Sequence, residues 1–225
     1  YSRQELASEM LKTQAQMNSL QSQINPLFLY NTLDSIIWMI QSKKYDGAGK
    51  MVSMLAKFFR ISLSQGKDII TLQKELEHAV SYLSIQNVRF QDKFTFTVDW
   101  DEKLADCLCP KLVIQPLLEN AVYHGMEGMY EDGEIQLKIY AVNELVHIDV
   151  IDNGEGMTEA QVQKMMQGDV VSSKRGSGIG VKNVNDRIKL YFGEAYGVQI
   201  ISAPDEGTTA RIYFPMRRQE DEIEK

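Results

Sequence analysis

The spacing of apolar residues changes once along this chain, after Arg89 and Phe90, and this change limits the folds open to it. Before that point apolar side chains recur at intervals of three and four residues, which is the period of amphipathic helices. After it, segments such as KFTFTVDW (93–100) alternate apolar and polar residues, as strands do. The pattern predicts a helical part over residues 1–90, followed by a part that mixes helices and strands.

The first 24 residues predict a helix with a coiled-coil seam. The seam residues alternate spacings of four and three: Leu6, Met10, Thr13, Met17, Leu20 and Ile24. The seam is short and has polar borders. These features favour a parallel dimer stem over the alternative, a helix packed within its own domain.

Pro26 interrupts this pattern, because proline removes a backbone donor and disrupts a helix interior. We expect a kink there, with a loosened backbone just before Leu27. Helical spacing resumes from Phe28 to Ile40, KKYDGAGK (43–50) predicts a turn, and a second apolar helix follows. Thr71 can cap a third helix.

The second part predicts an α+β sandwich, because its strands and helices do not alternate regularly. Strands are expected at 93–100, 135–142, 145–152, 197–203 and 208–215, and helices at 110–124, 159–167 and 181–191. We therefore expect an α+β fold, with a dimerising helical domain at 1–90, an α/β sandwich domain at 91–217 and a charged tail at 218–225.

Composition excludes several classes of protein. The net charge of −7 argues against nucleic acid as the main partner, since phosphate binding requires a basic surface. No apolar run reaches about 20 residues, so no segment is expected to span a membrane. Cys107 and Cys109 are expected to be reduced thiols, because one intervening residue strains a disulfide. The chain begins with Tyr1, and we expect it to be a cytoplasmic portion of a longer protein.

The segment PLLENAVYHG (116–125) offers a metal ligand on a predicted helix. Mg²⁺ prefers hard oxygen ligands and keeps several waters, so the amide oxygen of Asn120 plus nucleotide phosphates would suffice. Glu119 stands beside it. Taken alone, this pair is more typical of a solvated helix face.

Two glycine-containing segments add the remaining parts of a nucleotide site. DNGEGM (152–157) follows a predicted strand, where Asp152 could accept a hydrogen bond from an adenine amino group. GSGIG (176–180) leads into a helix, whose free N–H groups favour anions. The spacing matches neither a Rossmann fingerprint nor a Walker loop. Each segment alone also fits an ordinary turn.

Together and in this order, the three segments resemble the ATP site of the histidine-kinase/gyrase/Hsp90 superfamily across residues 90–215. The resemblance implies that Asn120 binds Mg²⁺, that Asp152 reads adenine and that His124 flanks the base or ribose. It implies that Thr208 supports the Asp152 end, and it makes Glu119 a candidate catalytic residue. Tyr123 replaces a lysine found in many relatives. The other implied ATP-site residues are Gly154, Gly156 and Met157 in the pocket and Gly176, Gly178, Ile179, Gly180 and Val181 in the lid and phosphate contacts.

The helical part is similar to LytS/YesM-type bacterial sensor histidine kinases. The segments that carry this resemblance are QINPLFLYNTLDSI (23–36) and TLQKELEHAVSYLSIQNVRF (71–90). The resemblance implies a homodimer, a response-regulator partner, and an upstream membrane-bound sensor.

The phosphoacceptor box reads QINPHFLYN in that family, and here Leu27 occupies the histidine position. Leucine has no nucleophilic nitrogen, so autophosphorylation at this position is not expected. The remaining histidines, His78, His124 and His147, lie outside the box. Two accounts stay open: a working kinase altered at one residue, or a natural variant that acts in a mixed dimer or as a nucleotide-gated module. An ATPase or serine kinase of the superfamily is disfavoured by the helical box.

Overall fold

The computed structural model describes residues 25–125, 132–168 and 179–218. The chain forms two compact units, which divide between Gly66 and Lys67. The predicted stem (1–24), the lid glycines Gly176 and Gly178, and the tail from residue 219 lie outside the described residues. None of the helices in the described ranges combines the length and apolar content that a membrane crossing requires.

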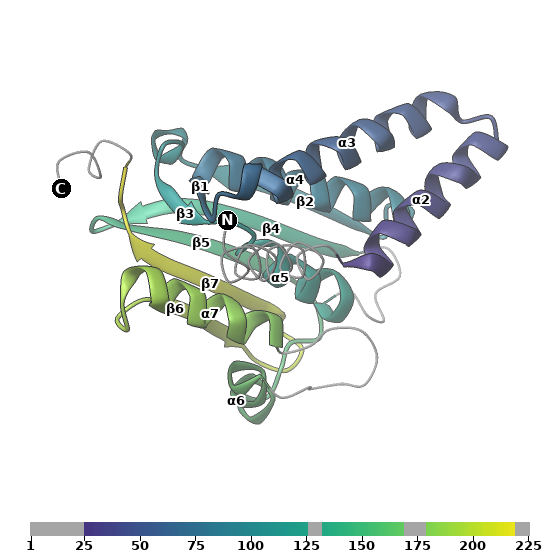
Figure 1. Cartoon of the computed structure of the whole chain (residues 1–225). Coiled ribbons are helices and arrows are strands. Elements are labelled where there is room, and N and C mark those ends of the chain that lie inside the picture. The colour runs from purple at the N-terminus through teal and green to yellow at the C-terminus, as the bar shows by residue number, and fades with distance from the viewer. Residues whose placement is uncertain (1–24, 126–131, 169–178, 219–225) are drawn as a thin grey trace, which may run out of the picture. The chain divides into compact units, whose positions relative to one another are not determined.

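The first unit is a helical hairpin of α2 (Pro26–Gln41) and α3 (Tyr45–Leu63), followed by the short η1 (Ser64–Gly66) (Figure 1). Pro26 begins α2 instead of kinking a helix, which corrects the expectation from sequence. The backbone of Asn25 is extended (φ −68°, ψ 109°), and its side chain accepts the N–H groups of Leu27 and Phe28. Proline is well suited to the first helical turn, where its missing donor would have no partner.

The two helices pack through aromatic and small polar side chains. The ring centroids of Phe28 and Phe58 lie 5.0 Å apart. The turn predicted over residues 43–50 is shorter in the structure, because α3 already begins at Tyr45 and includes Gly47 and Gly49. Lys43 adopts a left-handed φ of 58°, which reverses the chain within a few residues.

The second unit contains a mixed five-stranded sheet in the order β2-β4-β5-β7-β6. The strands are β2 (Phe94–Trp100), β4 (Gly133–Val142), β5 (Leu145–Asp152), β6 (Gly197–Ser202) and β7 (Thr208–Pro215). Strand β2 runs parallel to β4, and the other neighbours are antiparallel. Every strand expected from alternation is present, and the α+β fold is confirmed.

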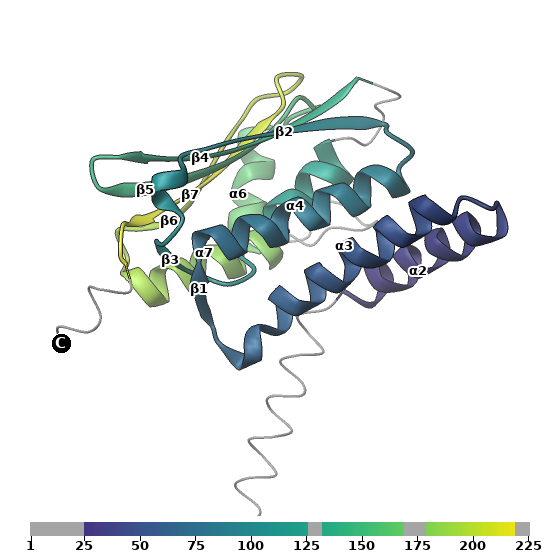
Figure 2. The ribbon, with the colours of Figure 1, turned by 90° about the horizontal axis from the view of Figure 1, so that it is seen from above.

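Helices of this unit cover one face of the sheet, as Figure 2 shows for α4 (Leu72–Arg89) and α7 (Ile179–Phe192). The residues of β4, β5 and β7 that point toward the helices are buried: Ile135, Leu137, Ile139, Val146, Ile148, Val150, Ala210, Ile212 and Phe214. On the opposite face Arg211 makes a bidentate pair with Asp149, at 2.8 Å for both bonds. This two-layer packing is what the alternating sequence predicts.

A small second sheet was not expected from sequence. Strand β1 (Ile69–Thr71) pairs antiparallel with β3 (Leu108–Pro110). The helix predicted to start at Pro110 is therefore wrong at its beginning: Pro110 ends β3, and α5 runs over Gln115–Asn120. A π-helical segment, η3 (Ala121–Gly125), continues α5. Cys107 and Cys109 are buried and reduced, as expected.

Helix α4 belongs to the second compact unit, although its sequence period resembles that of α2 and α3. Thr71 caps it as expected, accepting the N–H of Lys74. The N–H of Leu72 donates to the Cys107 carbonyl at 2.7 Å, which joins the start of α4 to the segment before β3. The predicted boundary after residue 90 marks the change in period, whereas the spatial division comes earlier because of such contacts.

Candidate nucleotide site

A pocket of about 450 Å³, including its open mouth, lies on the helix-covered side of the sheet. The described residues that line it are Leu117, Asn120, Ala121, Val150, Asp152, Gly156, Met157, Met165, Ile200, Thr208 and Ala210. The structure therefore brings together residues from α5, β5, the DNGEGM turn and β7 that are far apart in sequence.

Asp152 is the last residue of β5 and lies opposite Thr208 of β7 in the sheet register. The Asp152 side chain accepts the N–H of Gly154 at 2.9 Å. Burial raises the pKa of Asp152 from its ordinary 3.8 to about 6, although backbone N–H groups of Gly154 and Thr208 oppose the shift. The pocket thus contains a carboxylate that titrates within two pH units of neutrality.

The turn after Asp152 requires glycine at close approaches of the backbone. Gly156 has a φ of +68°, and a Cβ there would lie 1.9 Å from the carbonyl oxygen of Ala203. Gly207 has a φ of +76°, and a Cβ there would lie 2.1 Å from the carbonyl oxygen of Asp152. At both positions the glycine backbone lies directly against a neighbouring segment, Gly156 against Ala203 and Gly207 against Asp152, so the pocket rim packs on the β6–β7 connection.

Ser202 joins these pieces through its hydroxyl group. The hydroxyl donates to the Gly207 carbonyl at 2.8 Å and accepts the Met157 N–H at 2.9 Å. It also lies 2.8 Å from the Thr208 hydroxyl. Sequence reasoning missed Ser202, although it shares the inward phase of Val198 and Ile200 on β6.

The apolar wall of the pocket was also missed. Val150 and Ala210 alternate in phase with Asp152 and Thr208, so the strand period could have identified them. Met165 comes from α6 (Glu159–Gln167), and no local signal in the sequence pointed to it. An apolar wall with a few polar groups is the usual composition of a small-molecule site.

Asn120 ends α5 and lines the pocket, while its neighbour Glu119 does not. Glu119 is half-buried and accepts a hydrogen bond from Gln115 Nε2 at 2.9 Å. Burial raises the pKa of Glu119, and this hydrogen bond opposes the rise. Its position suits a role in holding α5.

The donor set fits a metal that is shared with a nucleotide. The described residues contain no group of three or more His, Cys, Asp and Glu side chains that could hold a metal ion by themselves. One amide oxygen from Asn120 fits Mg²⁺, which typically takes its remaining ligands from phosphates and water.

Tyr123 faces α4 and lies outside the pocket lining. Its hydroxyl accepts a hydrogen bond from Gln86 Nε2 at 3.1 Å, and the same amide donates to Tyr82 at 2.9 Å. The ring of Phe90 contacts that of Tyr123 edge-on, with centroids 5.9 Å apart. Tyr123 therefore connects η3 to α4.

The remaining predicted residues flank the pocket or lie beyond what the structure describes. Gly154 is in the turn after Asp152, and Val181 is fully buried in α7. A Cβ at Gly180 would lie 3.3 Å from Pro116, so the start of α7 packs closely on α5. His124 has its backbone in η3 and Ile179 in α7, but their side chains are outside the described part of the chain.

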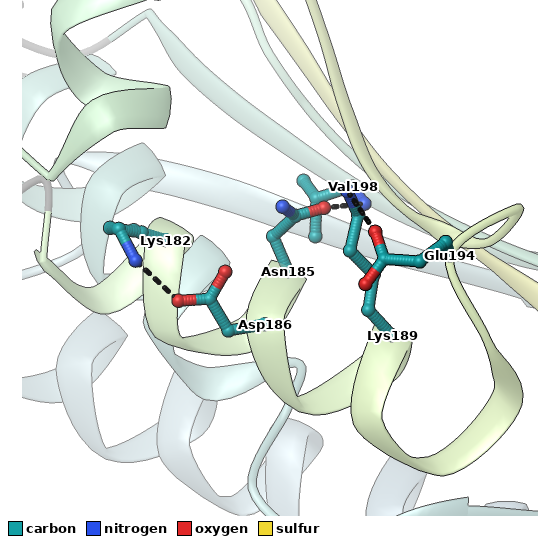
Figure 3. A network of polar contacts seen from close by, with 6 residues as sticks. All are labelled: Lys182, Asn185, Asp186, Lys189, Glu194 and Val198. Carbon is teal, nitrogen blue, oxygen red and sulfur yellow. Dashed lines mark hydrogen bonds and ion pairs between the residues drawn. The ribbon is translucent and has the colours of Figure 1, made fainter.

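Helix α7 is attached to β6 by a side-chain hydrogen bond, shown in Figure 3. Asn185 Oδ1 accepts the N–H of Val198 at 2.9 Å. Gly197, the preceding residue, leaves room for this contact, because a Cβ there would lie 2.3 Å from Asn185 Oδ1. Two ion pairs appear in the same view: Lys182–Asp186 within α7, and Lys189 of α7 with Glu194 just after it.

Two family models match the chain. The histidine kinase model matches residues 15–94, and the model of histidine kinase-, DNA gyrase B- and HSP90-like ATPases matches residues 107–218. The chain belongs to the sensor histidine kinase family.

Similar curated kinases match almost the whole chain. It is 37% identical over 211 residues to the sensor histidine kinase YesM of Bacillus subtilis, covering 94% of this chain and 35% of that protein. It is 32% identical over 219 residues to the sensor protein LytS of Bacillus anthracis, covering 97% of this chain and 37% of that protein. The chain thus spans little more than a third of the length of these kinases.

Solved structures share the fold at low sequence identity. The histidine kinase AdeS of Acinetobacter baumannii aligns with a TM-score of 0.50 and 13% identity, over 92% of this chain and 98% of that one. The catalytic domain of the histidine kinase ThkA aligns with a TM-score of 0.51 and 16% identity, over 66% of this chain and 96% of that one. At these identities the likeness concerns the fold alone.

Replacing Gly207 by alanine should destabilise the second unit more than the same change at Gly193. Both positions have a left-handed φ, which costs an ordinary residue about 1–2 kcal/mol. At Gly207 the new Cβ would also overlap the Asp152 carbonyl, whereas nothing lies within 4 Å at Gly193. Thermal unfolding of both variants checks this. Equal losses would show that the close approach at Asp152 has no energetic weight.

Proposed function

We propose that this chain is the nucleotide-binding and dimerising core of a two-component sensor histidine kinase. In this proposal the second unit binds Mg-ATP, and the kinase reaction passes the γ-phosphate to a histidine and then to a response regulator. The observation that carries it is the shared pocket of Asn120 and Asp152, which lie on α5 and at the end of β5. In the longer protein an upstream membrane-bound sensor would connect to the stem at residues 1–24.

The pocket chemistry supports adenine at the sheet end. A carboxylate oxygen of Asp152 can accept a hydrogen bond from the exocyclic amino group at C6 of adenine. Guanine has no amino group at C6. Leu117, Val150 and Ile200 offer apolar surface for the ring. Asn120 would hold Mg²⁺, which when bound neutralises phosphate charge. Gly180 and Val181, at the start of α7, lie where free N–H groups favour phosphate.

Adenosine binding should weaken as the pH falls through about 6, the pKa of Asp152. Only the ionised carboxylate offers a charged acceptor, so we expect about a tenfold loss of affinity between pH 7 and pH 5. Adenosine has no phosphate that titrates in this range. Titration calorimetry from pH 5 to pH 8 measures the effect.

Asp152→Asn should bind adenosine and Mg-ATP more weakly at pH 7, with an adenosine affinity that does not depend on pH.

The raised pKa of Asp152 also fixes the sign of its effect on stability. Folding favours the neutral side chain, so this contribution is present below pH 4 and is lost as pH rises through about 6. Asp152→Asn should therefore be more stable than the unmodified chain at pH 7. A folded, unmodified chain that fails to bind ATP would refute the nucleotide-binding role.

The first unit supports dimerisation through an apolar stripe on α2. Its members are exposed and spaced by three, four and three residues: Tyr30, Leu33, Ile37 and Ile40. This is the spacing of a helix that packs against a partner helix. We infer that a second copy of the chain covers the stripe, with the stem at residues 1–24 extending the interface.

Ile37→Lys should weaken the dimer, because association would desolvate an unpaired charge. Ile37 is 50% exposed, so the substitution need not disturb the fold of one protomer. Ile37→Leu is the matched control, since it changes the shape but keeps the stripe apolar. Light scattering at micromolar concentration should give a dimer for the unmodified chain and for Ile37→Leu, and a shift toward monomer for Ile37→Lys. A monomeric unmodified chain would contradict the proposal.

Leu27 favours a second candidate function, a nucleotide-gated dimer module or a protomer of a mixed kinase dimer. Leu27 is 49% exposed in the first turn of α2, and its N–H donates to Asn25 Oδ1 at 3.0 Å. The side chain is accessible but offers no nucleophile. A phosphoryl group could therefore be accepted at position 27 only if another residue stood in place of Leu27.

Leu27→His should restore acid-labile labelling by γ-phosphate if the chain is a kinase disabled at one position. The unmodified chain should show none. Asp34→His provides the control, because it places an exposed histidine two turns further along the same helix and outside the apolar stripe. An unlabelled Leu27→His variant that still binds ATP would favour the non-catalytic module. Labelling of the unmodified chain would mean that the acceptor lies elsewhere.

A further inference from the structure

Glu75 is a fully buried carboxylate in the first turn of α4, outside the nucleotide motifs. Its two oxygens accept three consecutive backbone N–H groups. Leu112 donates to Oε2 at 2.8 Å, and Val113 and Ile114 donate to Oε1 at 2.8 Å and 3.0 Å. One side chain thus binds a segment that lies almost 40 residues away in the sequence.

The three N–H groups belong to the residues that lead into α5. Donors at a helix start have no partner within the helix, and a nearby side chain usually caps them. Ile114 occupies the N-cap position of α5 and supplies no side-chain cap. Leu112 has a φ of +59°, an unfavourable conformation for leucine, which must be held by its surroundings. Glu75 therefore anchors, from a different helix, the segment that leads into α5.

The position of α5 decides where Asn120 lies. The helix contains six residues, so its start and Asn120 are separated by about 8 Å of rigid backbone. Pro116 at its start also meets Gly180 at the start of α7. Asp152, in contrast, is fixed by its pairing in the sheet. The two sides of the pocket consequently depend on different supports.

Burying a carboxylate costs free energy, because the charged group loses its hydration. Burial raises the pKa of Glu75, which the three N–H groups and the charge of Arg187 on α7 oppose. A core that needed only volume would use an apolar side chain at this position. The geometry instead suits the capture of a specific backbone segment.

We propose that Glu75 is a positioning residue that couples α4 to the metal side of the nucleotide pocket, by fixing the start of α5 and thereby Asn120. The metal and nucleotide in this statement rest on the function proposed above. A displacement of α4, the first helix after the helical hairpin, would be transmitted to Asn120 through Glu75. The adenine contacts Asp152, Val150 and Ile200 would keep their places in the sheet.

Glu75→Gln tests the coupling, because the neutral amide has one acceptor oxygen and presents donors to the remaining N–H groups. We expect Mg-ATP affinity to fall roughly tenfold, a typical strength of coupling between sites. Adenosine affinity should fall less, by about twofold or below, since adenosine lacks the groups that meet the metal side and Leu117 is the one proposed adenine contact that α5 carries. Glu102→Gln, at an exposed position of the same unit, should leave both affinities unchanged. Calorimetry measures the affinity of each variant and of the unmodified chain for Mg-ATP and for adenosine.

Amide hydrogen exchange without nucleotide tests the anchoring independently of ATP. In the unmodified chain the amides of residues 112–114 should be strongly protected. Glu75→Gln should speed exchange across residues 112–120 while leaving β5 and β7 unchanged. Glu75→Asp, whose shorter side chain cannot keep all three contacts, gives the same test if Glu75→Gln does not fold.

Distinct outcomes separate this inference from the proposed function. Equal loss of adenosine and Mg-ATP affinity, or no loss of either, would overturn the selective coupling. Unprotected amides at 112–114 in the unmodified chain would overturn the anchoring itself. If the unmodified chain bound no ATP, the proposed function would fail, and the exchange experiment would still decide whether Glu75 fixes α5.

Discussion

The candidate site depends on the packing of helices against one face of the five-stranded sheet. Val150 and Ala210 on that face are buried beside Asp152 and Thr208, so apolar core and polar pocket share the same strand phase. The pocket forms between these strand residues and the side chains of α5 and α6. The opposite face is polar, as the Asp149–Arg211 pair illustrates. A sheet with apolar residues on both faces could not leave one face open to solvent.

Polar groups at the pocket are held at a cost in stability. Asp152 is buried enough to raise its pKa, and only backbone N–H groups oppose that penalty. Gly156 and Gly207 adopt conformations that exclude larger residues, and Ser202 closes the rim by joining three backbone or side-chain groups. Such strained and desolvated groups are typical of functional sites, where their chemistry compensates for the stability they cost.

The two family models match the helical region and the sandwich in chain order, over residues 15–94 and 107–218. Leu27, at the predicted acceptor position, is exposed at a helix start that Asn25 and Pro26 form. The local backbone suits an exposed side chain, but leucine offers no nucleophile. The helical hairpin and the candidate pocket are thus both formed in a chain with leucine at this position.

The sequence by itself determined the elements whose period is local. Alternation identified the strands from Phe94 to Pro215, and Thr71 marked the start of α4. The segments PLLENAVYHG and DNGEGM identified Asn120, Asp152 and Gly156, which do meet at one pocket. Their roles toward a ligand stay predictions. Helix boundaries near proline were less certain, because proline is compatible with a kink, a helix start or a strand end.

Only the tertiary structure decided the contacts between distant segments. The β1–β3 pair and the capture of residues 112–114 by Glu75 both join segments more than 30 residues apart, and α5 starts directly after them at Gln115. Tyr123 faces α4 because Gln86 and Phe90 lie there, which no local pattern encodes. A period of 2 or 3.6 residues specifies which face of an element is apolar. It does not specify which distant backbone donors a buried carboxylate will satisfy, because that depends on the packing of the whole unit.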